Sequence, residues 1–337
     1  MSKSVGIYIG TAEKIGNAYS KDIKNKISEK LDMLPEFYDI QKLRNSEDLF
    51  ELKKVEYIFS TWGMAELSEE EIKNILPNLK AVFYAAGTVQ YFARPYMNCG
   101  VKVFSAWGAN AVPVAEVAAA EIILANKGFF QTVHNGSGAE WTEHDKGVPY
   151  CGNYDTNVGI IGAGMIGTLV IKKLKEYRLN TLVFDPFMTE ERAAELGVEK
   201  VSGLPELFER CQVVSNHLAN NPQTVNMIDK SCFNKMKPNG VFINTGRGQQ
   251  VVEKDMIDTL KECPARCAVL DVTNPEPPVQ GSELYTLPNI FLTPHMAGSI
   301  GNEIQRMGEY MYDEFCAFTE NKPLKYLVTE KMLETMA

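Results

Sequence analysis

The sequence predicts an α/β protein of two domains, each a doubly wound parallel sheet with helices on its faces. Short apolar runs alternate with longer segments of helical pattern, as in chains whose parallel strands are joined by crossover helices. These runs fall into two series, one in the first part of the chain and one that starts at Val158. The length of 337 residues also exceeds what a single ordinary core holds.

The first series predicts a domain with five strands. VGIYIG predicts a buried first strand, followed by a long helix that ends near Leu31. A short second strand is expected over residues 37–40, and three more are expected in VEYIFS, PNLKAVFYAA and VKVFSAW. The alanine-rich run VPVAEVAAAEIILANKGFF, which begins at Val112, predicts a buried helix that serves as a connector or as a subunit contact.

The second series predicts six strands. In chain order they are expected in VGIIG, TLVFD, VVSNH, GVFINT, AVLDV and NIFLTPH, each followed by turn-forming residues. Ligands of open parallel sheets bind beyond the carboxyl ends of the strands. The residues that follow these runs are therefore the candidates for a functional site.

Three glycines with the spacing of a dinucleotide-binding turn follow the strand at Val158. In GIIGAGMIG, the residues Gly162, Gly164 and Gly167 match G-x-G-x-x-G between a strand and the helix TLVIKKLKEY. Gly162 permits the tight turn, Gly164 lets the backbone approach a pyrophosphate, and Gly167 lets the helix pack on the strand. The amino end of the helix then offers free N–H groups and a positive dipole end to the phosphates.

Spaced glycines alone are a weak signal, because ordinary turns also contain them. The next strand strengthens it: TLVFD ends in Asp185, which follows Gly167 by 185 − 167 = 18 residues. A carboxylate at this place accepts hydrogen bonds from the ribose hydroxyls and repels a 2′-phosphate. No arginine adjoins Asp185, so we expect NAD(H) rather than NADP(H) as the cofactor.

Three residues suited to acid–base and carboxylate chemistry follow three later strands. Arg247 comes after VFIN, Glu276 after AVLDV and His295 after IFLT. An arginine holds a carboxylate and polarises a carbonyl with its planar fork of donors. A histidine delivers a proton near neutral pH, and a carboxylate on its far nitrogen fixes the tautomer and favours the charged form.

Each of the three residues also has an ordinary interpretation when it is taken alone. Arg247 could be a surface residue in a glycine loop, Glu276 an exposed acid in a proline-rich segment, and His295 a turn cap. Their joint occurrence at strand ends favours hydride transfer between NAD(H) and a small 2-oxo or 2-hydroxy acid, with His295 as proton donor and acceptor.

Four motifs in order resemble the D-isomer-specific 2-hydroxyacid dehydrogenase family. They are GIIGAGMIG, INTGRGQQV, LDVTNPEPP and LTPHMAGS, and the resemblance extends over nearly the whole chain. It implies that Arg247, Glu276 and His295 form a catalytic trio and that Asp271 lies near the nicotinamide carboxamide. The LDVTNPEPP form is similar to the glyoxylate/hydroxypyruvate reductase and general hydroxyacid dehydrogenase branches.

The resemblance also implies a domain plan. A flavodoxin-like substrate or catalytic domain would be made from both chain ends, residues 1–108 and 296–337. A Rossmann NAD-binding domain, residues 109–295, would be inserted in it, and a homodimer through the cofactor domains would be typical. Because 337 − 295 = 42 residues follow His295, we expect no regulatory domain like that of the longer phosphoglycerate dehydrogenases.

Further site residues are expected from the family's pattern. The loop after VFYAA and the polar residue in GANAVPVAE are expected to bind the substrate carboxylate, through Ala86, Gly87 and Asn110. For Asn110 a capping role is an equal alternative, and for His217 a structural role is as well supported as a cofactor contact. Besides the three glycines, Asp185 and Asp271, the expected cofactor contacts are Met165, Ile166, His217, Thr245 and Gly246.

Composition narrows the classes of partner. The formal net charge is −9, the pI is near 5.2, and no basic block interrupts the chain, so we expect neither nucleic acid nor a membrane surface as partner. No apolar run was expected to reach the roughly 20 residues that cross a bilayer, and no signal peptide pattern begins the sequence. Seven scattered cysteines indicate reduced thiols, no metal site is expected, and the expected location is the cytoplasm.

Some questions stay open from the sequence. An NADH-binding regulatory protein of the corepressor kind uses the same scaffold and is the alternative to an enzyme. The motifs do not say which 2-oxo acid is used or in which direction the reaction runs. Trp62, Met64 and Trp107 follow strands and could line the substrate pocket, although aromatic residues at such places more often serve packing.

Overall fold

The computed structural model describes residues 3–46, 49–133 and 150–334, and it divides the chain into two compact units. Unit 1 comprises Met1–Ala111 and Ser299–Ala337, and unit 2 comprises Val112–Gly298. The first unit thus contains both chain ends, and the second is one continuous insertion. Each border lies three residues from the expected one (111 − 108 = 3 and 299 − 296 = 3). The assignment of substrate and cofactor to these units remains a prediction.

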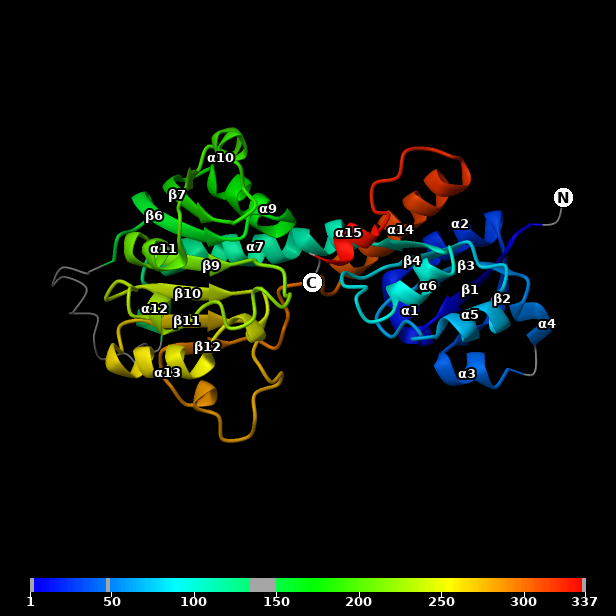
Figure 1. The fold of residues 1–337 in the computed structure, drawn as a ribbon, viewed down its shortest axis with the longest axis horizontal. Helices are drawn as coiled ribbons and strands as arrows, with labels where there is room; N and C mark the ends of the chain where they lie inside the picture. Colours follow the sequence, from blue (N-terminus) through cyan, green and yellow to red (C-terminus); the bar gives the residue numbers. More distant parts are fainter. Residues whose placement is uncertain (1–2, 47–48, 134–149, 335–337) are drawn as a thin grey trace. The chain divides into compact units, whose positions relative to one another are not determined.

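Unit 1 contains a five-stranded sheet with the order β2-β1-β3-β4-β5, in which all neighbours are parallel (Figure 1). The strands are β1 (Val5–Ile9), β2 (Asp32–Tyr38), β3 (Val55–Ser60), β4 (Ala81–Tyr84) and β5 (Lys102–Ser105). The chain winds outward from β1 to β2 and then restarts on the other side with β3. The predicted doubly wound sheet is confirmed for this unit.

Helices cover both faces of this sheet because its strands are apolar on both sides. One core cluster joins the strands to α1, α2 and α14, and the other joins them to the helices α3 to α6. The helix bounds are α1 (Ala12–Ala18), α2 (Lys21–Lys30), α3 (Ile40–Arg44), α4 (Leu49–Leu52), α5 (Glu69–Ile75), α6 (Ala93–Asn98), α14 (Glu303–Thr319) and α15 (Glu330–Leu333). The late helix α14 packs on α1 so closely that a Cβ on Gly308 would lie 2.0 Å from the carbonyl oxygen of Ala18.

Unit 2 contains a seven-stranded parallel sheet with the order β12-β11-β10-β9-β6-β7-β8. The strands are β6 (Tyr154–Ile161), β7 (Arg178–Phe184), β8 (Glu199–Lys200), β9 (Val213–Asn216), β10 (Val241–Asn244), β11 (Cys267–Leu270) and β12 (Ile290–Leu292). The winding direction reverses between β6 and β9. In doubly wound sheets, this reversal point is where the loops at the carboxyl ends of the strands separate and leave room for a ligand.

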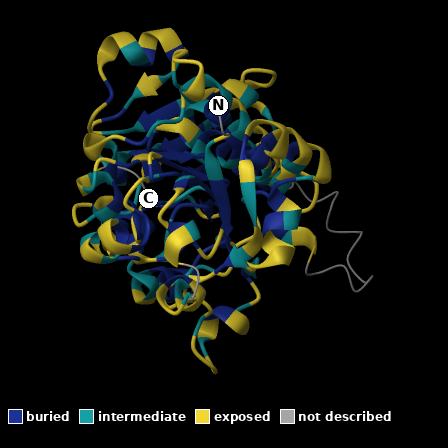
Figure 2. Ribbon diagram, turned by 90° about the vertical axis from the view of Figure 1, so that its right-hand side faces the viewer, coloured by how far each residue is buried: buried dark blue, intermediate teal, exposed yellow. Residues whose placement is uncertain are grey.

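Helices again cover both faces of the sheet in unit 2. One core cluster contains residues of α7 to α10, and the other contains residues of α11 to α13. The strands of unit 1, at the right of Figure 1, face the viewer in Figure 2, where most of the visible strand ribbon is buried and the helices carry exposed residues. The bounds are α7 (Trp107–Asn126), α8 (Phe129–Thr132), α9 (Met165–Leu174), α10 (Glu190–Leu196), α11 (Leu204–Arg210), α12 (Lys230–Phe233), α13 (Glu253–Glu262), η3 (Gly248–Gln250) and η4 (Glu283–Tyr285).

Two expectations for the first domain were wrong in detail. The long first helix is interrupted at Tyr19, whose buried hydroxyl donates to the carbonyls of Ser60 and Phe83, while Ser20 caps a new helix. The second strand spans Asp32–Tyr38, so it begins 37 − 32 = 5 residues before the expected start, and it ends before residue 40 because Asp39 accepts a hydrogen bond from the N–H of Lys42 and starts α3. In both cases a polar side chain caps a helix at a place that the apolar pattern does not indicate.

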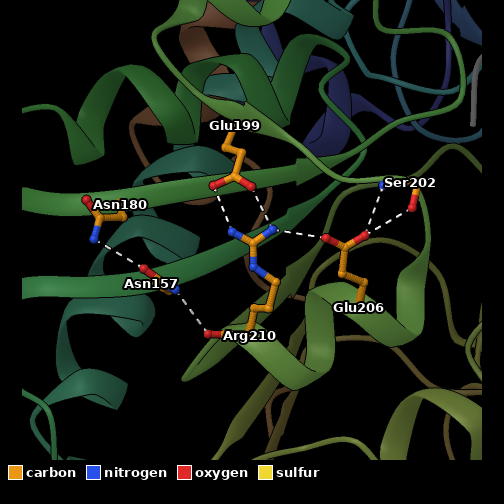
Figure 3. A network of polar contacts seen from close by, with 6 residues as sticks. All are labelled: Asn157, Asn180, Glu199, Ser202, Glu206 and Arg210. Atoms are coloured by element: carbon orange, nitrogen blue, oxygen red, sulfur yellow. Dashed lines mark hydrogen bonds and ion pairs between the residues drawn. The ribbon is translucent and has the colours of Figure 1, made fainter.

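The short edge strand β8 was not predicted, and an ionic network holds it in place. Arg210 on α11 donates to both carboxylate oxygens of Glu199 on β8 and to Glu206 one helical turn earlier (Figure 3). Glu206 also accepts from the backbone N–H and the hydroxyl of Ser202. The flanking residues Val198 and Val201 pack in the core clusters of unit 2, and this surface network adds to their packing.

Helix α7 is longer and more apolar than the sequence analysis allowed. With 20 residues it is long and apolar enough to cross a membrane by length and composition, contrary to the expectation that no such run exists. However, 56% of its most apolar stretch is buried inside the structure. Core helices of globular proteins pass the same test, and Ala115, Ala118 and Ile122 pack in the core of unit 2, as the predicted buried helix requires.

Candidate functional site

The predicted glycine turn lies at the reversal point of the sheet in unit 2. Gly162 follows β6 with φ +82°, a left-handed conformation that favours glycine. A Cβ on this residue would lie 3.1 Å from the carbonyl oxygen of His217 and from the N of Leu218 on the adjacent strand end. A Cβ on Gly167 would lie 2.0 Å from the carbonyl oxygen of Gly162. These two positions have no room for a side chain.

Gly164 differs from its two neighbours in the motif, because it faces open space. It is the N-cap of α9, no side chain caps the helix, and nothing lies within 4 Å of the position of a Cβ. Met165, which is exposed, and Ile166 form the first turn of the helix. The free backbone N–H groups at this helix end, together with the open approach over Gly164, fit the pyrophosphate of a dinucleotide.

Asp185 lies directly after β7 and braces the glycine turn. Its Oδ2 accepts a hydrogen bond of 2.8 Å from the N–H of Ala163, and its Oδ1 accepts one of the same length from Phe187. A carboxylate oxygen accepts more than one hydrogen bond. The side chain is only half-buried, so it keeps acceptor capacity for ribose hydroxyls.

His217 lies in a buried position after β9, between two hydroxyl groups. Its Nε2 lies 3.0 Å from the hydroxyl of Ser215, and its Nδ1 lies 3.2 Å from that of Thr245. Burial lowers the pKa of His217 to about 3, so the ring is neutral near pH 7. Both ring nitrogens have partners, so this histidine is unsuited to exchanging protons with a substrate.

Arg247 follows β10 in the loop that begins with Thr245 and Gly246. One of its guanidinium nitrogens, Nη1, donates to the carbonyl oxygen of Gly246 at 2.7 Å, which leaves other donors of the fork for a ligand. Burial lowers the pKa of Arg247, and the nearby Glu276 carboxylate acts in the opposite direction. The ordinary arginine pKa is so high that the side chain stays charged.

His295 and Glu276 form a direct pair. The Nδ1 atom of His295 lies 2.5 Å from Oε1 of Glu276, and both side chains are accessible, with 46% and 41% of their surface exposed. The other ring nitrogen, Nε2, is not occupied by this contact. A carboxylate that accepts from Nδ1 fixes Nε2 as the atom that exchanges a proton with a ligand.

Asp271 fixes the loop that carries His295. Its Oδ1 accepts from the hydroxyl of Thr293 at 2.6 Å and from the N–H of Met296 at 2.7 Å, and its Oδ2 accepts from the N–H of Ala297 at 2.9 Å. His295 between them has φ +53°, an uncommon value for a residue with a side chain. The Asp271 carboxylate therefore stabilises a strained backbone; whether it also contacts a nicotinamide carboxamide remains an expectation.

The structure brings the predicted trio to the ends of three adjacent strands, β10, β11 and β12. We call the loop after β10 that carries Arg247 the arginine loop. A Cβ on Gly248 in this loop would lie 2.0 Å from the carbonyl carbon of Thr273, so the arginine loop contacts the loop that carries Glu276. Glu276 contacts His295 and is close enough to Arg247 to affect its pKa. A cation and an acid–base pair therefore share one edge of this sheet.

The residues predicted for the substrate carboxylate lie together in unit 1. The hydroxyl of Ser105 lies 2.9 Å from the carbonyl oxygen of Ala86 and 2.5 Å from that of Gly87. Asn110 accepts from the N–H of Ser299 through Oδ1, and its Nδ2 lies 3.4 Å from where a Cβ on Gly87 would be. Ser105 thus holds the carbonyls of the turn at Ala86 and Gly87, and Asn110 on α7 places its amide donor beside Gly87.

The aromatic and sulfur-containing candidates separate into different environments. Met64 is buried in the core of unit 1, which supports the packing alternative. Trp107 contacts the ring of Tyr326, with 5.3 Å between the ring centroids, and Trp62 is 39% exposed. From the sequence, His134 and His144 are expected to be solvated; both lie outside the described residues. Within the described residues no group of three potential metal ligands occurs.

Sequence reasoning missed a set of buried amides beside the arginine loop. Asn216, Asn244 and Gln250 are almost completely buried and hydrogen-bonded to one another. A signal was available: Asn216 and Asn244 end two apolar strands, where a polar residue must find a partner inside the protein. The pairing itself was not predictable, because it depends on which strands are neighbours.

The comparisons with known proteins agree with this architecture. Residues 120–297 match the family model described as D-isomer specific 2-hydroxyacid dehydrogenase, NAD binding domain. The D-3-phosphoglycerate dehydrogenase of Methanocaldococcus jannaschii is 33% identical over 59% of this chain, and the glyoxylate reductase of Korarchaeum cryptofilum is 32% identical over 54%. The chain spans 38% of the length of the first relative and 54% of the second.

A solved structure shows the same fold at low sequence identity. The D-mandelate dehydrogenase of Rhodotorula graminis in its apo form superposes with a TM-score of 0.81, with 20% identity, over 97% of this chain and 98% of that one. The family match covers more than half of the residues (297 − 120 + 1 = 178 of 337). Fold, motif order and family match together show that the chain belongs to the D-isomer specific 2-hydroxyacid dehydrogenase family.

Proposed function

We propose that this protein interconverts a small 2-oxo acid and the D-2-hydroxy acid by NAD(H)-dependent hydride transfer. The observation that carries the proposal is the accessible His295–Glu276 pair, 2.5 Å apart, at the strand ends beside Arg247. NADH, when bound, supplies the hydride that reduces the carbonyl carbon. Nε2 of His295 donates a proton to the carbonyl oxygen in the reduction and takes it back in the oxidation, while Glu276 stabilises the charged ring.

Arg247 supplies the charge that such a substrate requires. A guanidinium binds a carboxylate through two parallel hydrogen bonds, and a third donor direction polarises the adjacent carbonyl. The contact of Nη1 with Gly246 orients the fork and leaves donors for the ligand. We assign Ala86, Gly87 and Asn110 as further contacts of the substrate carboxylate, supported by the Ser105 contacts that fix this turn.

The cofactor assignment rests on the glycine turn and the acid that follows it. We assign the pyrophosphate to the open side of Gly164 and the amino end of α9, and the adenosine ribose to Asp185. The carboxylate of Asp185 disfavours a 2′-phosphate, which supports NADH over NADPH. The loop residues Thr245 and Gly246, and the backbone around His217, complete the proposed lining.

We also propose a homodimer formed through unit 2 and a location in the cytoplasm. At the carboxyl end of α7 and in α8, three apolar residues are exposed: Leu124 by 39%, Phe129 by 41% and Val133 by 47%. Apolar residues grouped on two successive helices favour a subunit contact. All seven cysteines are free thiols, which suits a reducing compartment.

The proposal is tested by assaying a panel of 2-oxo acids with NADH, following the loss of NADH absorbance. For His295→Ala we expect kcat to fall by about 10²–10⁴-fold, the range for a lost general acid, while NADH binding measured by fluorescence is retained. Val279→Ala, an exposed substitution in the neighbouring proline-rich loop, serves as the control. Tight NADH binding without turnover of any acid would instead favour a regulatory, corepressor-like protein.

A further inference from the structure

Three buried amide side chains form a hydrogen-bonded cluster beside the arginine loop, with Asn216 joining the other two. Nδ2 of Asn216 donates to Oδ1 of Asn244 at 3.0 Å and to Oε1 of Gln250 at 2.7 Å. The exposed fraction of the three side chains is 0% for Asn216 and Gln250 and 1% for Asn244. We call these residues the amide cluster. An amide buried this deeply is tolerated only when its polar atoms are paired.

Other polar atoms of the amide cluster form hydrogen bonds with the backbone of the arginine loop. Oε1 of Gln250 accepts from the N–H of Arg247 at 3.0 Å, and Nδ2 of Asn244 donates to the carbonyl oxygen of Arg247 at 3.3 Å. Oδ1 of Asn244 also accepts from the N–H of Gly246 at 3.0 Å. Both backbone polar groups of Arg247 are therefore bonded to buried side chains, which fixes the point from which its guanidinium extends.

The same cluster holds the loop after the neighbouring strand β9. Nε2 of Gln250 donates to the carbonyl oxygens of Leu218 and Ala219, both at 3.0 Å, and Oδ1 of Asn216 accepts from the N–H of Leu218 at 3.2 Å. This loop forms the wall against which the backbone of Gly162 packs. One cluster thus connects the arginine loop to the loop beside the glycine turn.

We propose that Asn216, Asn244 and Gln250 are positioning residues for the reaction, and that they set the place of Arg247 relative to the dinucleotide-binding turn. This inference rests on the proposed function, because it assumes that Arg247 binds the substrate. Because the three side chains are buried, we infer that the cluster acts through the backbone of the two loops that it bonds. We expect the cluster to keep Arg247 in its correct position, because a displacement of about 1 Å at a reacting centre can cost on the order of 100-fold in rate.

The first test replaces Gln250 by methionine, which has a similar length and no hydrogen-bonding amide. For Gln250→Met we expect kcat/KM for the preferred 2-oxo acid to fall by roughly 10- to 100-fold, with weaker binding of oxamate to the NADH complex. The Kd of NADH should change by much less, because the glycine turn and Asp185 remain. Gln223→Met is the matched control: Gln223 is an exposed glutamine that contacts Asn221 through its backbone N–H, and we expect wild-type kinetics.

A second, milder variant guards against misfolding. Asn244→Ser removes the donor to the carbonyl oxygen of Arg247 but leaves the contacts of Gln250 with Asn216 and with the N–H of Arg247 in place. We expect it to be at least as stable as Gln250→Met in thermal unfolding, because fewer buried groups lose a partner, and still to lower kcat/KM and oxamate affinity. A folded Asn244→Ser protein with wild-type kinetics overturns the positioning role. If Arg247→Ala also keeps full activity, the proposed function itself fails, and the two failures are thereby separated.

Discussion

At the scale of single residues, the loop of His295 combines strain with a buried anchor. His295 has φ +53°. The backbone N–H groups of the next two residues, Met296 and Ala297, donate to the carboxylate of Asp271, which is 4% exposed. Strained conformations persist where the surroundings determine them, and such places concentrate at functional sites. Here the hydroxyl of Thr293 and the two N–H groups donate to one carboxylate, and these three hydrogen bonds hold the loop in its conformation.

Replacing Asp271 by asparagine keeps the shape of the side chain but should break at least one of these hydrogen bonds. One carboxylate oxygen becomes an NH₂ group that faces a donor, so the free energy of unfolding should fall by about 1–3 kcal/mol. We expect kcat to fall as well, because His295 loses its fixed position. Denaturant unfolding and steady-state kinetics measure both, and Thr293→Val, which removes only one donor, should have the smaller effect. A folded Asp271→Asn protein with unchanged kcat would contradict this role.

The buried His217 should make stability sensitive to acid. Burial lowers its pKa from 6.5 to about 3, so the unfolded chain binds a proton at a higher pH than the folded protein does. The stability that depends on the neutral ring is fully present above pH 6.5 and is lost as the pH falls toward 3, by up to about 1.4 kcal/mol per pH unit. Denaturant unfolding of wild type and His217→Gln at several pH values checks this. The stability difference between the two proteins should shrink with acidification; a constant difference would refute it.

Among single residues, the positions of the trio were easier to predict than the side chains that support them. Arg247, Glu276 and His295 stand out because they follow three apolar strands within a few residues, and the structure places Glu276 beside His295; their catalytic roles stay predictions. The pairing of His217 with Ser215 and Thr245 was not found, because it joins side chains from two strands whose adjacency the sequence does not state. For the same reason, the hydrogen bonds of Asn216 with Asn244 and Gln250 were not predicted.

At the scale of elements, the turn from β6 into α9 contains two glycines that should respond differently when a side chain is added. A Cβ on Gly167 would clash with the carbonyl oxygen of Gly162, whereas a Cβ on Gly164 would meet nothing within 4 Å. The first glycine serves the packing of strand and helix. The second leaves room for a ligand.

This contrast gives a matched pair of substitutions. Gly167→Ala should lower the free energy of unfolding by about 1–3 kcal/mol through overpacking. Gly164→Ala should leave stability nearly unchanged and weaken NADH binding, because the added methyl group occupies the space assigned to the pyrophosphate. Thermal unfolding and NADH titration of both variants distinguish the two effects. Equal loss of stability in both would show that Gly164 is also a packing residue.

The strands were predictable because buried parallel strands are continuous apolar runs, and VEYIFS corresponds residue for residue to β3. The failures have local causes. The helix break at Tyr19 involves a tyrosine hydroxyl that reaches two strand carbonyls, and β8, which Arg210 on α11 contacts, is too short for any apolar pattern. Periodicity reports burial, but it does not report hydrogen bonds between distant segments.

At the scale of the whole molecule, the oligomeric state is the main expectation to be tested. If the exposed apolar residues of α7 and α8 form a subunit contact, Leu124→Glu should convert a dimer to a monomer in sedimentation analysis, because a buried unpaired charge is costly at an interface. Val225→Glu, at an apolar residue of similar exposure outside these helices (44%), is the control. A wild-type monomer, or a dimer unaffected by the first change, would contradict the proposed interface.

The way unit 1 is assembled from both chain ends has a consequence for biosynthesis. Its sheet is covered on one face by α14, whose Gly308 lies directly against Ala18 near the start of the chain. While residues 303–319 are still being made, only α1 and α2 are available to cover that face, whereas all residues of unit 2 have already been made. We therefore expect the nascent polypeptide to carry a partly exposed apolar sheet until α14 emerges, and this half is where chaperone protection matters most.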